Sequence, residues 1–450
     1  MKKTLFAVLM ICMTTAASAQ NVKSPDPMSA MLDSVPSVNY DKTKIRSYVL
    51  EDPLQFVDGS KVNGPEDWQR RRKEILDIFQ HEMFGMLPPS SPIYLEEFES
   101  GTTLSGFGHR RQVSMWFRED HTGPRIDWLI VTPTHVKGPA PAVMLLNMMG
   151  NQTVMSDPEI RLTDSWQGLK PYYFLENHHA TELSRGMYEG EQLRMTFPVA
   201  TILARGYALV TACYAEVSPD PDRIPDEDGV LMQDKFAYTG VFDLWGKRDP
   251  NKLDNTSAIM AWAWALMRGM DMIEKDPSLD ASKVVLTGAS RLGKAALLAS
   301  AYDERFPVTA LVQCGGGGVT LAKRNFGESI ATEVFKFRHW YCRAYDKYAD
   351  NEDNMPFDQH LLLSAIAPRA VLVQGFGSPW YDTEGEYIAV KAADPVWKMF
   401  GFKGVQSEAW PDPYDTSAIG DRLGYVRREQ LHGISPIDWK WMLDFADSIF

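Results

Sequence analysis

The sequence predicts an α/β protein with a mostly parallel central sheet and an extended N-terminal segment. Beyond residue 195, short apolar runs typical of buried strands alternate with longer runs of helical periodicity. Such alternation builds right-handed βαβ units and a parallel sheet whose functional sites lie at the carboxyl ends of the strands. Composition agrees, because a chain of 450 residues with 44% hydrophobic and 23% charged residues can bury a large core and is neither disordered, collagenous nor coiled-coil.

The first 19 residues have the pattern of a secretory signal peptide. Two lysines within residues 1–3 precede an apolar stretch over residues 4–13, and the small residues at 17–19 form a cleavage site. The apolar stretch is too short to span a bilayer. Cys12 follows bulky rather than small residues, so a lipid anchor is the weaker alternative. We therefore expect a secreted or periplasmic protein.

Charge and cysteine usage exclude several classes of partner and scaffold. The net charge of −13 argues against nucleic acid or an anionic membrane surface as the main partner. No second apolar run approaches the roughly 18 residues that a transmembrane helix needs, so we expect no integral membrane segment. Three cysteines remain after the signal peptide, which allows at most one disulfide. The sequence carries no signal for an oligomeric state.

The chain before residue 195 predicts a lead-in, a helix and a group of strands. Residues 20–65 are polar and rich in proline, which predicts an extended lead-in, and the main domain is expected over residues 66–450. This domain opens with an amphipathic helix over residues 66–86, where apolar residues recur at helical spacing. Three strand-type runs then predict an antiparallel entry into the sheet, at residues 112–117, 126–131 and 142–146.

The second half of the chain supplies the alternating elements of the parallel sheet. Ser435 and Pro436 have the types preferred at the N-cap and the first position of the last helix. The predicted strands cover residues 208–211, 284–287, 308–312, 370–374 and 424–429. The predicted helices cover residues 257–274, 294–302 and 436–449.

Residues 283–297 predict a buried strand, a tight turn and a helix, with Ser290 at the apex of the turn. Small neighbours let the turn close, which lifts the serine Oγ above the sheet as a nucleophile. The backbone N–H of Arg291 would then point into an oxyanion site at the helix N-terminus. The second glycine of the pattern is Gly293, three residues after the serine, so a serine in an ordinary glycine-rich turn is the alternative.

A nucleophilic serine needs a base, which on such a scaffold follows it in the chain. Of the nine histidines, only His339, His360 and His432 come after Ser290. His432 lies in a predicted loop between the last strand and the last helix, where the fold would present a base. His339 and His360 have aromatic and apolar neighbours, for which packing is the expected role.

Two other motifs are expected to be loops and not ligand sites. The run of glycines at 315–318 lacks the Gly-Lys-Ser/Thr ending of a phosphate cradle, so we expect a flexible loop beside the active site. His178 and His179, with Glu176 or Glu182, lack the spacing of a metal site, because adjacent side chains of a regular element point to opposite faces. We expect no metal and no cofactor.

A tryptophan-rich helical segment precedes the Ser290 turn, and further short motifs are spread over the chain from about residue 65 to its end. They are residues 258–264, Asp271, Asp276-Pro277, residues 287–295, Asn147, Gly150-Asn151, Arg205-Gly206-Tyr207, Arg324, Phe326-Gly327-Glu328, Asp358-Gln359-His360, Ala367-Pro368-Arg369, Trp380 and Asp382. Together they resemble the bacterial branch of the glucuronoyl esterases, carbohydrate esterase family 15.

This resemblance implies an α/β-hydrolase fold, a three-layer sandwich around a mostly parallel sheet. It further implies serine-type hydrolysis, without metal or cofactor, of the ester between a 4-O-methyl-glucuronic acid on xylan and a lignin alcohol. The partners would be plant cell-wall glucuronoxylan or lignin–carbohydrate esters. Carried over to this sequence, Ser290 would be the nucleophile and His432 the base, and Arg291 would stabilise the oxyanion.

The resemblance also implies the residues that contact the uronate sugar. Lys294, Glu328 and Trp380 match positions with that role. Their chemistry suits it, because an ammonium and a carboxylate bind sugar hydroxyls and an indole stacks on a pyranose face. Without the resemblance, we would interpret the two charged residues as exposed helix charges and Trp380 as a packed loop aromatic.

The chain departs from the family at the acid that orients the histidine. Family members place this carboxylate after one of two strands, and here these positions hold Gln313 and Ser378. Replacing the triad carboxylate by its amide costs on the order of 10⁴ in turnover in a protease. The sequence therefore predicts either a substitute acid or a weakened enzyme.

Three nearby carboxylates could substitute, and Asp382 is the nearest in sequence and our predicted catalytic acid; Glu384 and Glu386 are the others. In the alternative, Gln313 or Ser378 orients the histidine with reduced activity, or the site is degenerate. A degenerate site would leave a non-catalytic carbohydrate-binding relic of the same fold. Within the enzyme class, the alternative substrates are acetyl or methyl sugar esters.

Overall fold

The computed structural model describes most of the chain from residue 38 onward. The described residues all belong to one compact unit, Ser37–Phe450, which is the second of the chain's two divisions. The predicted signal peptide lies outside the described residues, as does the beginning of the lead-in. The described ranges are residues 38–168, 173–190, 195–226, 228–429 and 432–450.

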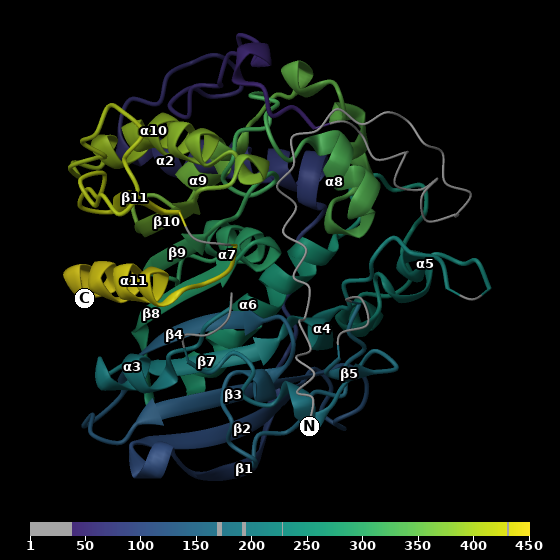
Figure 1. Ribbon diagram of the computed structural model, residues 1–450. Helices are drawn as coiled ribbons and strands as arrows, with labels where there is room; N and C mark the ends of the chain where they lie inside the picture. Colours follow the sequence, from purple (N-terminus) through teal and green to yellow (C-terminus); the bar gives the residue numbers. More distant parts are fainter. Residues whose placement is uncertain (1–37, 169–172, 191–194, 227, 430–431) are drawn as a thin grey trace, which may run out of the picture. The chain divides into compact units, whose positions relative to one another are not determined.

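A nine-stranded sheet forms the centre of the second unit, in the order β1-β2-β3-β7-β4-β8-β9-β10-β11 (Figure 1). From β1 to β7 the neighbouring strands are antiparallel, and from β7 to β11 they are parallel. The strands are β1 (Tyr94–Thr103), β2 (Gly108–Trp116), β3 (Arg125–Pro133), β4 (Ala140–Asn147), β7 (Ala208–Cys213), β8 (Leu279–Ala289), β9 (Val308–Val312), β10 (Ala370–Phe376) and β11 (Leu423–Arg428).

The predicted antiparallel entry is correct for two strands and wrong for the third. β2 and β3 are antiparallel, but β4 pairs in parallel with β7 and β8, with Ala142 opposite both Ala208 and Val284. The chain therefore enters the parallel part of the sheet at β4. The sequence did not reveal β1, because this strand is acidic and largely exposed at the edge of the sheet.

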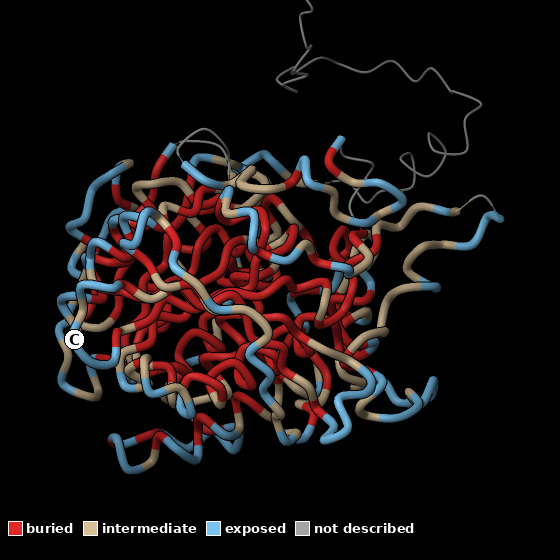
Figure 2. The backbone as a smooth tube through the Cα atoms, turned by 90° about the horizontal axis from the view of Figure 1, so that it is seen from below, coloured by how far each residue is buried: buried red, intermediate tan, exposed pale blue. Residues whose placement is uncertain are grey.

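The apolar side chains of each central strand alternate between two cores. In β8, Val284 and Leu286 belong to one core and Val285 and Ala289 to the other. One core is covered by α2 (Pro65–Phe79), α6 (Ala258–Lys275), α7 (Arg291–Tyr302), α9 (Gln359–Ser364) and α10 (Thr383–Met399). The other is covered by α3 (Val199–Ala204) and α11 (Pro436–Ile449). These are the three predicted layers, and in Figure 2 the buried residues gather in the interior, with exposed residues around them.

The helix ends follow their local sequence. The Ser257 hydroxyl accepts the backbone N–H of Met260 at the start of α6. Ser435 and Asp438 form a reciprocal capping box at the start of α11, with Pro436 at the first position as predicted. α10 was not predicted, because Pro395 lies inside it.

Several short elements occur in the connections. They are α4 (Tyr214–Val217), α5 (Met232–Phe236), α8 (Ile330–Lys336), β5 (Leu175–Glu176) and β6 (His179–Ala180). Among the described residues, no helix has both the length and the apolar character that crossing a membrane requires. Because β8 to β11 are parallel, their carboxyl ends meet at one edge of the sheet, which is where sites form in sheets of this kind.

Candidate active site

Ser290 lies directly after β8, in a strained turn that leads into α7. Its backbone has φ 57° and ψ −129°, a conformation that non-glycine residues rarely adopt. The Ser290 N–H donates to the carbonyl of Val312 at 3.0 Å, which ties the turn to the end of β9. This is the geometry of a nucleophile elbow, in which the strain is held by the packed elements on both sides.

Gly293 explains why the glycine pattern of the turn is stretched. A Cβ at this position would lie 2.6 Å from Cys314 Sγ and 2.9 Å from the carbonyl oxygen of Gly288. The first turn of α7 therefore packs directly on the end of β8 and on the residue that follows Gln313. The glycine is required by this close approach.

His432 follows β11, and its Nδ1 lies 2.7 Å from Gln313 Oε1. The same oxygen accepts the backbone N–H of Gly433 at 2.8 Å, so the amide oxygen faces the histidine loop. An amide oxygen can only accept, so Nδ1 carries the hydrogen and Nε2 is the basic nitrogen. Gln313 thus selects the tautomer that a serine nucleophile needs.

Tyr381 connects the serine to the histidine, and sequence reasoning did not identify it. Burial raises the pKa of the Tyr381 hydroxyl above its usual value, and the neighbouring Ser290 side chain lowers it in part. Its ring stacks on the imidazole of His432, with centroids 4.5 Å apart. The ring of Phe376 also lies beside this imidazole, with centroids 5.3 Å apart. The structure therefore brings Ser290 and His432 together at one edge of the sheet.

Arg291, the first residue of α7, is held by a buried carboxylate. Its guanidinium forms an ion pair with Asp220 and lies over the ring of Trp340, 4.7 Å from the centroid. Asp220 also accepts hydrogen bonds from His339 Nε2 and Trp340 Nε1, each at 2.7 Å. Burial alone would raise the pKa of Asp220, but Arg291 and these donors hold it below its usual value. Asp220 is thus ionised and fixes the guanidinium beside the elbow.

Lys294 lies one turn further along α7, in a buried cluster of charges. Its Nζ is 3.7 Å from Glu328 Oε2 and 3.6 Å from Glu333 Oε1. The Tyr341 hydroxyl donates to Glu333 at 2.6 Å. Burial, opposed by Lys294, raises the pKa of Glu333 to about 8. Glu333 is therefore protonated at neutral pH, and Lys294 is left to pair with Glu328.

Trp380 is half-buried next to this cluster, in the turn Pro379–Tyr381 that follows β10. Its carbonyl accepts the N–H of Glu328 at 2.7 Å. Lys336 lies over its ring at 4.9 Å. The structure thus places Lys294, Glu328 and Trp380, the three predicted sugar contacts, in one neighbourhood.

The carboxylate of Asp382, the predicted catalytic acid, forms an ion pair with an arginine. Asp382 Oδ2 lies 2.9 Å from Arg324 Nε, and burial, opposed by Arg324, raises the pKa of Asp382 to about 6. Glu384 pairs with the same arginine at 2.8 Å. Glu386 accepts the backbone N–H of Gly315 at 3.3 Å, and burial raises its pKa to about 8. The Nδ1 nitrogen of the histidine faces the amide of Gln313 instead.

The glycine run at 315–318 is packed rather than flexible, which corrects the predicted loop. Its four residues are buried, and a Cβ at Gly317 would lie 2.0 Å from the Tyr341 hydroxyl. At Gly315 a Cβ would lie 2.6 Å from the ring of Tyr381. The run forms a wall beside the active site because only glycine backbone fits there.

The other histidines that we considered lie in hydrogen-bonded positions. His339 is buried against Asp220, and His360 Nε2 lies 2.7 Å from the carbonyl of Glu51. His178 and His179 contact backbone carbonyls through Nδ1, those of Gln167 and Asp164, at 2.9 and 3.1 Å.

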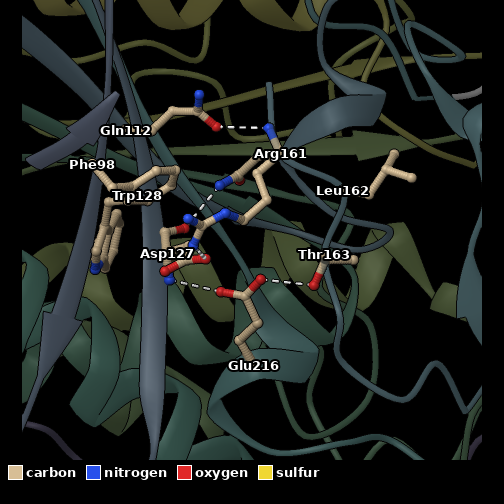
Figure 3. A pocket seen from close by; sticks show the side chains of 9 residues that line it. Phe98, Gln112, Asp127, Trp128, Arg161, Leu162, Thr163 and Glu216 are labelled. Carbon is tan, nitrogen blue, oxygen red and sulfur yellow. Dashed lines mark hydrogen bonds and ion pairs between the residues drawn. The ribbon is translucent and has the colours of Figure 1, made fainter. Parts of the chain in front are cut away.

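A small polar cavity lies near the end of β7. Its volume of about 10 Å³ is too small for a sugar. Figure 3 shows that its side chains bind one another: Glu216 contacts the backbone of Asp127 and the hydroxyl of Thr163. Arg161 pairs with Asp127 at 3.1 Å. Burial, and then the nearby charge of Asp127, raise the pKa of Glu216 to about 8.

Comparison with known proteins identifies the family. The sequence model of the family described as "Glucuronyl esterase, fungi" matches residues 210–401. The chain is 34% identical over 415 residues to carbohydrate esterase MZ0003 of an unknown prokaryotic organism, covering 91% of each chain. It is 27% identical over 369 residues to the 4-O-methyl-glucuronoyl methylesterase of Phanerochaete carnosa, covering 78% of this chain and 72% of that protein.

A solved structure supports the same assignment. A promiscuous CE15 esterase from the marine bacterial metagenome superposes with a TM-score of 0.82 at 33% identity, covering 92% of this chain and all of that one. The predicted fold and family are thereby confirmed, including the bacterial branch. The chain belongs to carbohydrate esterase family 15, the glucuronoyl esterases, and is a carboxylic ester hydrolase with an α/β-hydrolase fold.

Proposed function

We propose that this chain hydrolyses 4-O-methyl-glucuronoyl esters, the uronate esters that join xylan to lignin alcohols. The observation that carries the proposal is the convergence of Ser290 and His432 on Tyr381, beside the cluster of Lys294 and Glu328. The name of the relative from Phanerochaete carnosa supports the uronate as the acyl group. No cofactor takes part in the proposed reaction.

In the first half of the reaction, Ser290 Oγ attacks the ester carbonyl while His432 Nε2 accepts its proton. The carbonyl oxygen becomes an oxyanion, which the backbone N–H of Arg291 and its guanidinium stabilise. This N–H belongs to the first turn of α7 and has no acceptor within the helix. Asp220 positions the guanidinium without touching the substrate.

In the second half, the tetrahedral intermediate expels the alcohol, which takes the proton from the imidazolium. The glucuronoyl group is left as an ester of Ser290. A water molecule, deprotonated by His432 Nε2, attacks this acyl-enzyme and releases the free uronic acid and the serine hydroxyl. Gln313 keeps the imidazole oriented in both steps but, being neutral, gives the imidazolium less stabilisation than a carboxylate would.

We assign Lys294, Glu328 and Trp380 to the sugar of the substrate. The ammonium and the carboxylate are nearly buried and offer a donor and an acceptor for hydroxyl groups. The indole offers a flat face for a pyranose. Asp382, paired with Arg324, we assign to the support of the turn that carries Trp380 and Tyr381.

We also propose that the enzyme acts outside the cytoplasm. A uronate ester in a plant cell wall lies outside the cell that degrades it. The pattern of residues 1–19 supports export, either to the periplasm or beyond it.

Benzyl glucuronate hydrolysis tests the proposal. We expect the parent protein to release benzyl alcohol, and Ser290→Ala to lose at least about a thousandfold of kcat/KM, because the covalent path is removed. Ser282→Ala, at a serine near the start of β8, is the matched control and should keep the parental rate. Circular dichroism confirms folding of each variant.

Equal rates for the parent and Ser290→Ala would overturn the proposal. A parent that binds glucuronoxylan fragments saturably but hydrolyses no uronate ester would instead support a carbohydrate-binding relic. Faster hydrolysis of acetylated sugars than of benzyl glucuronate would point to the alternative sugar esters.

A further inference from the structure

The described part of the lead-in forms one wall of a cleft next to the predicted sugar contacts. The cleft has a volume of about 690 Å³, within the range of roughly 300–1,000 Å³ that is common for small-molecule sites. Residues 38–44 supply most of its lining, the segment before α8 supplies Asn325 and Ser329, and Asp350 completes it. The lining side chains that matter here are those of Asn39, Tyr40, Asp41, Lys44, Asn325 and Ser329.

Hydrogen bonds connect this cleft to the predicted sugar contacts Lys294, Glu328 and Trp380, which we call the uronate cluster. The N–H of Gly327 donates to the carbonyl of Asn39 at 2.9 Å, and Asn39 Nδ2 donates to the carbonyl of Asn325 at 3.0 Å. The next residue, Glu328, bonds to Trp380. Burial, and then the charge of Glu328, raise the pKa of Tyr40. Asn325 and Ser329 line the cleft, and Glu328, which lies between them in the chain, pairs with Lys294, so one short segment borders both sites.

The lead-in is fixed on the domain where it forms this wall. Lys42 pairs with Glu384 at 2.6 Å, and that glutamate is also held by Arg324. Further along the lead-in, Glu51 pairs with Lys323. These contacts hold the segment against the first turn of α10 and against Lys323, so the cleft is formed before any ligand arrives.

The chemistry of the cleft suits an uncharged sugar. Tyr40 is 51% exposed, so its ring offers a face on which a pyranose can stack. The amide and hydroxyl groups of Asn39 and Ser329 supply hydrogen-bond donors and acceptors. The ammonium of Lys44 is balanced by Asp41 at 3.9 Å, so the cleft lacks the excess of positive charge that a second uronate would require.

We infer that this cleft is a subsite for the neutral sugar residues adjoining the uronate in the glycan, and that Tyr40 is the residue on which one of them stacks. The inference rests on the proposed function, since it extends the same substrate beyond its esterified sugar. The lead-in thereby makes the enzyme selective for esters on a polysaccharide chain over esters of the free uronic acid.

Kinetics on two substrates test this inference. The first is the benzyl ester of free 4-O-methyl-glucuronic acid, and the second is the same ester with the uronate attached to xylotriose. The readout is the ratio of kcat/KM for the second substrate to that for the first. We expect Tyr40→Ala to lower this ratio roughly twofold to tenfold, because one aromatic stacking contact is lost.

Two further variants separate stacking from other effects. Tyr40→Phe keeps the ring and should keep the parental ratio. Phe107→Ala removes a partly exposed aromatic residue from the turn between β1 and β2, far along the sheet, and should also keep it. Calorimetric titration of Ser290→Ala with uronate-substituted xylotriose should show the same loss of affinity on adding Tyr40→Ala.

The outcomes distinguish the inference from the proposed function. If the parent hydrolyses neither ester, the proposed function fails. If the parent hydrolyses both but its ratio equals that of Tyr40→Ala, and calorimetry shows equal affinities, the subsite inference is overturned while the proposed function stands. A loss in Tyr40→Phe as large as in Tyr40→Ala would also overturn it, because the phenol hydroxyl and not the ring would then be responsible.

Discussion

At the active-site edge of the sheet, an amide takes the place of the carboxylate that usually supports a catalytic histidine. Gln313 Oε1 accepts from His432 and from the backbone of Gly433, and both donors could equally serve a carboxylate oxygen. The amide therefore reproduces the orientation but not the charge. This missing negative charge matters when the histidine becomes an imidazolium, because a carboxylate would stabilise that cation and the amide does so less.

Gln313→Glu tests this reasoning. The added carboxylate stabilises the imidazolium, so we expect kcat to rise at least about tenfold. The acid limb of the kcat/KM profile should move to higher pH by about one to three pH units, because a nearby negative charge favours the protonated histidine. The measurement is a pH–rate profile with benzyl glucuronate.

Gln313→Leu is the companion variant, since it removes the acceptor and keeps a similar volume. We expect its kcat to fall below that of the parent. A Gln313→Glu profile that coincides with the parental profile would show that this residue does not act on His432.

At the level of elements, the loop that carries His432 is held between β11 and α11. Arg428, the last residue of β11, pairs with Asp438 in the first turn of α11 at 2.8 Å. Its guanidinium also donates to the carbonyl of Gly433 at 2.6 Å, next to the histidine. Asp438 in turn accepts the N–H and hydroxyl of Ser435. One buried ion pair thus fixes both ends of the loop.

Asp438→Asn should weaken stability and catalysis together. Breaking a buried pair by removing one charge costs about 3–5 kcal/mol of unfolding free energy, because the other charge stays buried. The loosened loop should also lower kcat more than it raises KM. Urea unfolding and steady-state kinetics measure the two effects.

The matched control lies on the same helix. Asp444 forms exposed pairs with Arg205 and Lys440, so Asp444→Asn should change stability by less than about 1 kcal/mol and leave kcat at the parental value. Equal effects of the two substitutions would contradict the role of the Arg428 pair.

For the whole molecule, buried carboxyls make stability depend on pH. Glu386 has a pKa of about 8 because it is buried, whereas an unfolded glutamate titrates near 4.3. Between these values the folded state holds a proton that the unfolded state releases. The stabilisation from this group is therefore fully present below about pH 4.3 and is lost as pH rises toward 8. Glu216 and Glu333 act in the same direction.

Glu386→Gln should flatten this dependence. The side chain can still accept the N–H of Gly315 but no longer titrates. We expect the fall in unfolding free energy between pH 5.5 and 8 to shrink by on the order of 1 kcal/mol per pH unit. Denaturant unfolding at several pH values measures it. Glu408→Gln, at an exposed position, should leave the dependence as in the parent, and an equal flattening there would contradict the argument.

Local sequence was sufficient where a structure is made by neighbours in the chain. The strand, turn and helix around Ser290 involve consecutive residues, so apolar periodicity and small residues predicted them. The capped start of α11 was predictable for the same reason. α10 was missed because its internal proline contradicts its helical pattern, and packing against the sheet overrides that preference.

The sequence alone determined the elbow, the family and the order of serine and histidine in the chain. Only the tertiary structure decided what supports them. Gln313 and His432 are 119 positions apart and meet because β9 and β11 end at one edge of the sheet. The carboxylate of Asp382, near in sequence, is turned to Arg324. The partner of a buried polar group is set by which elements pack together, and chain proximity does not encode that.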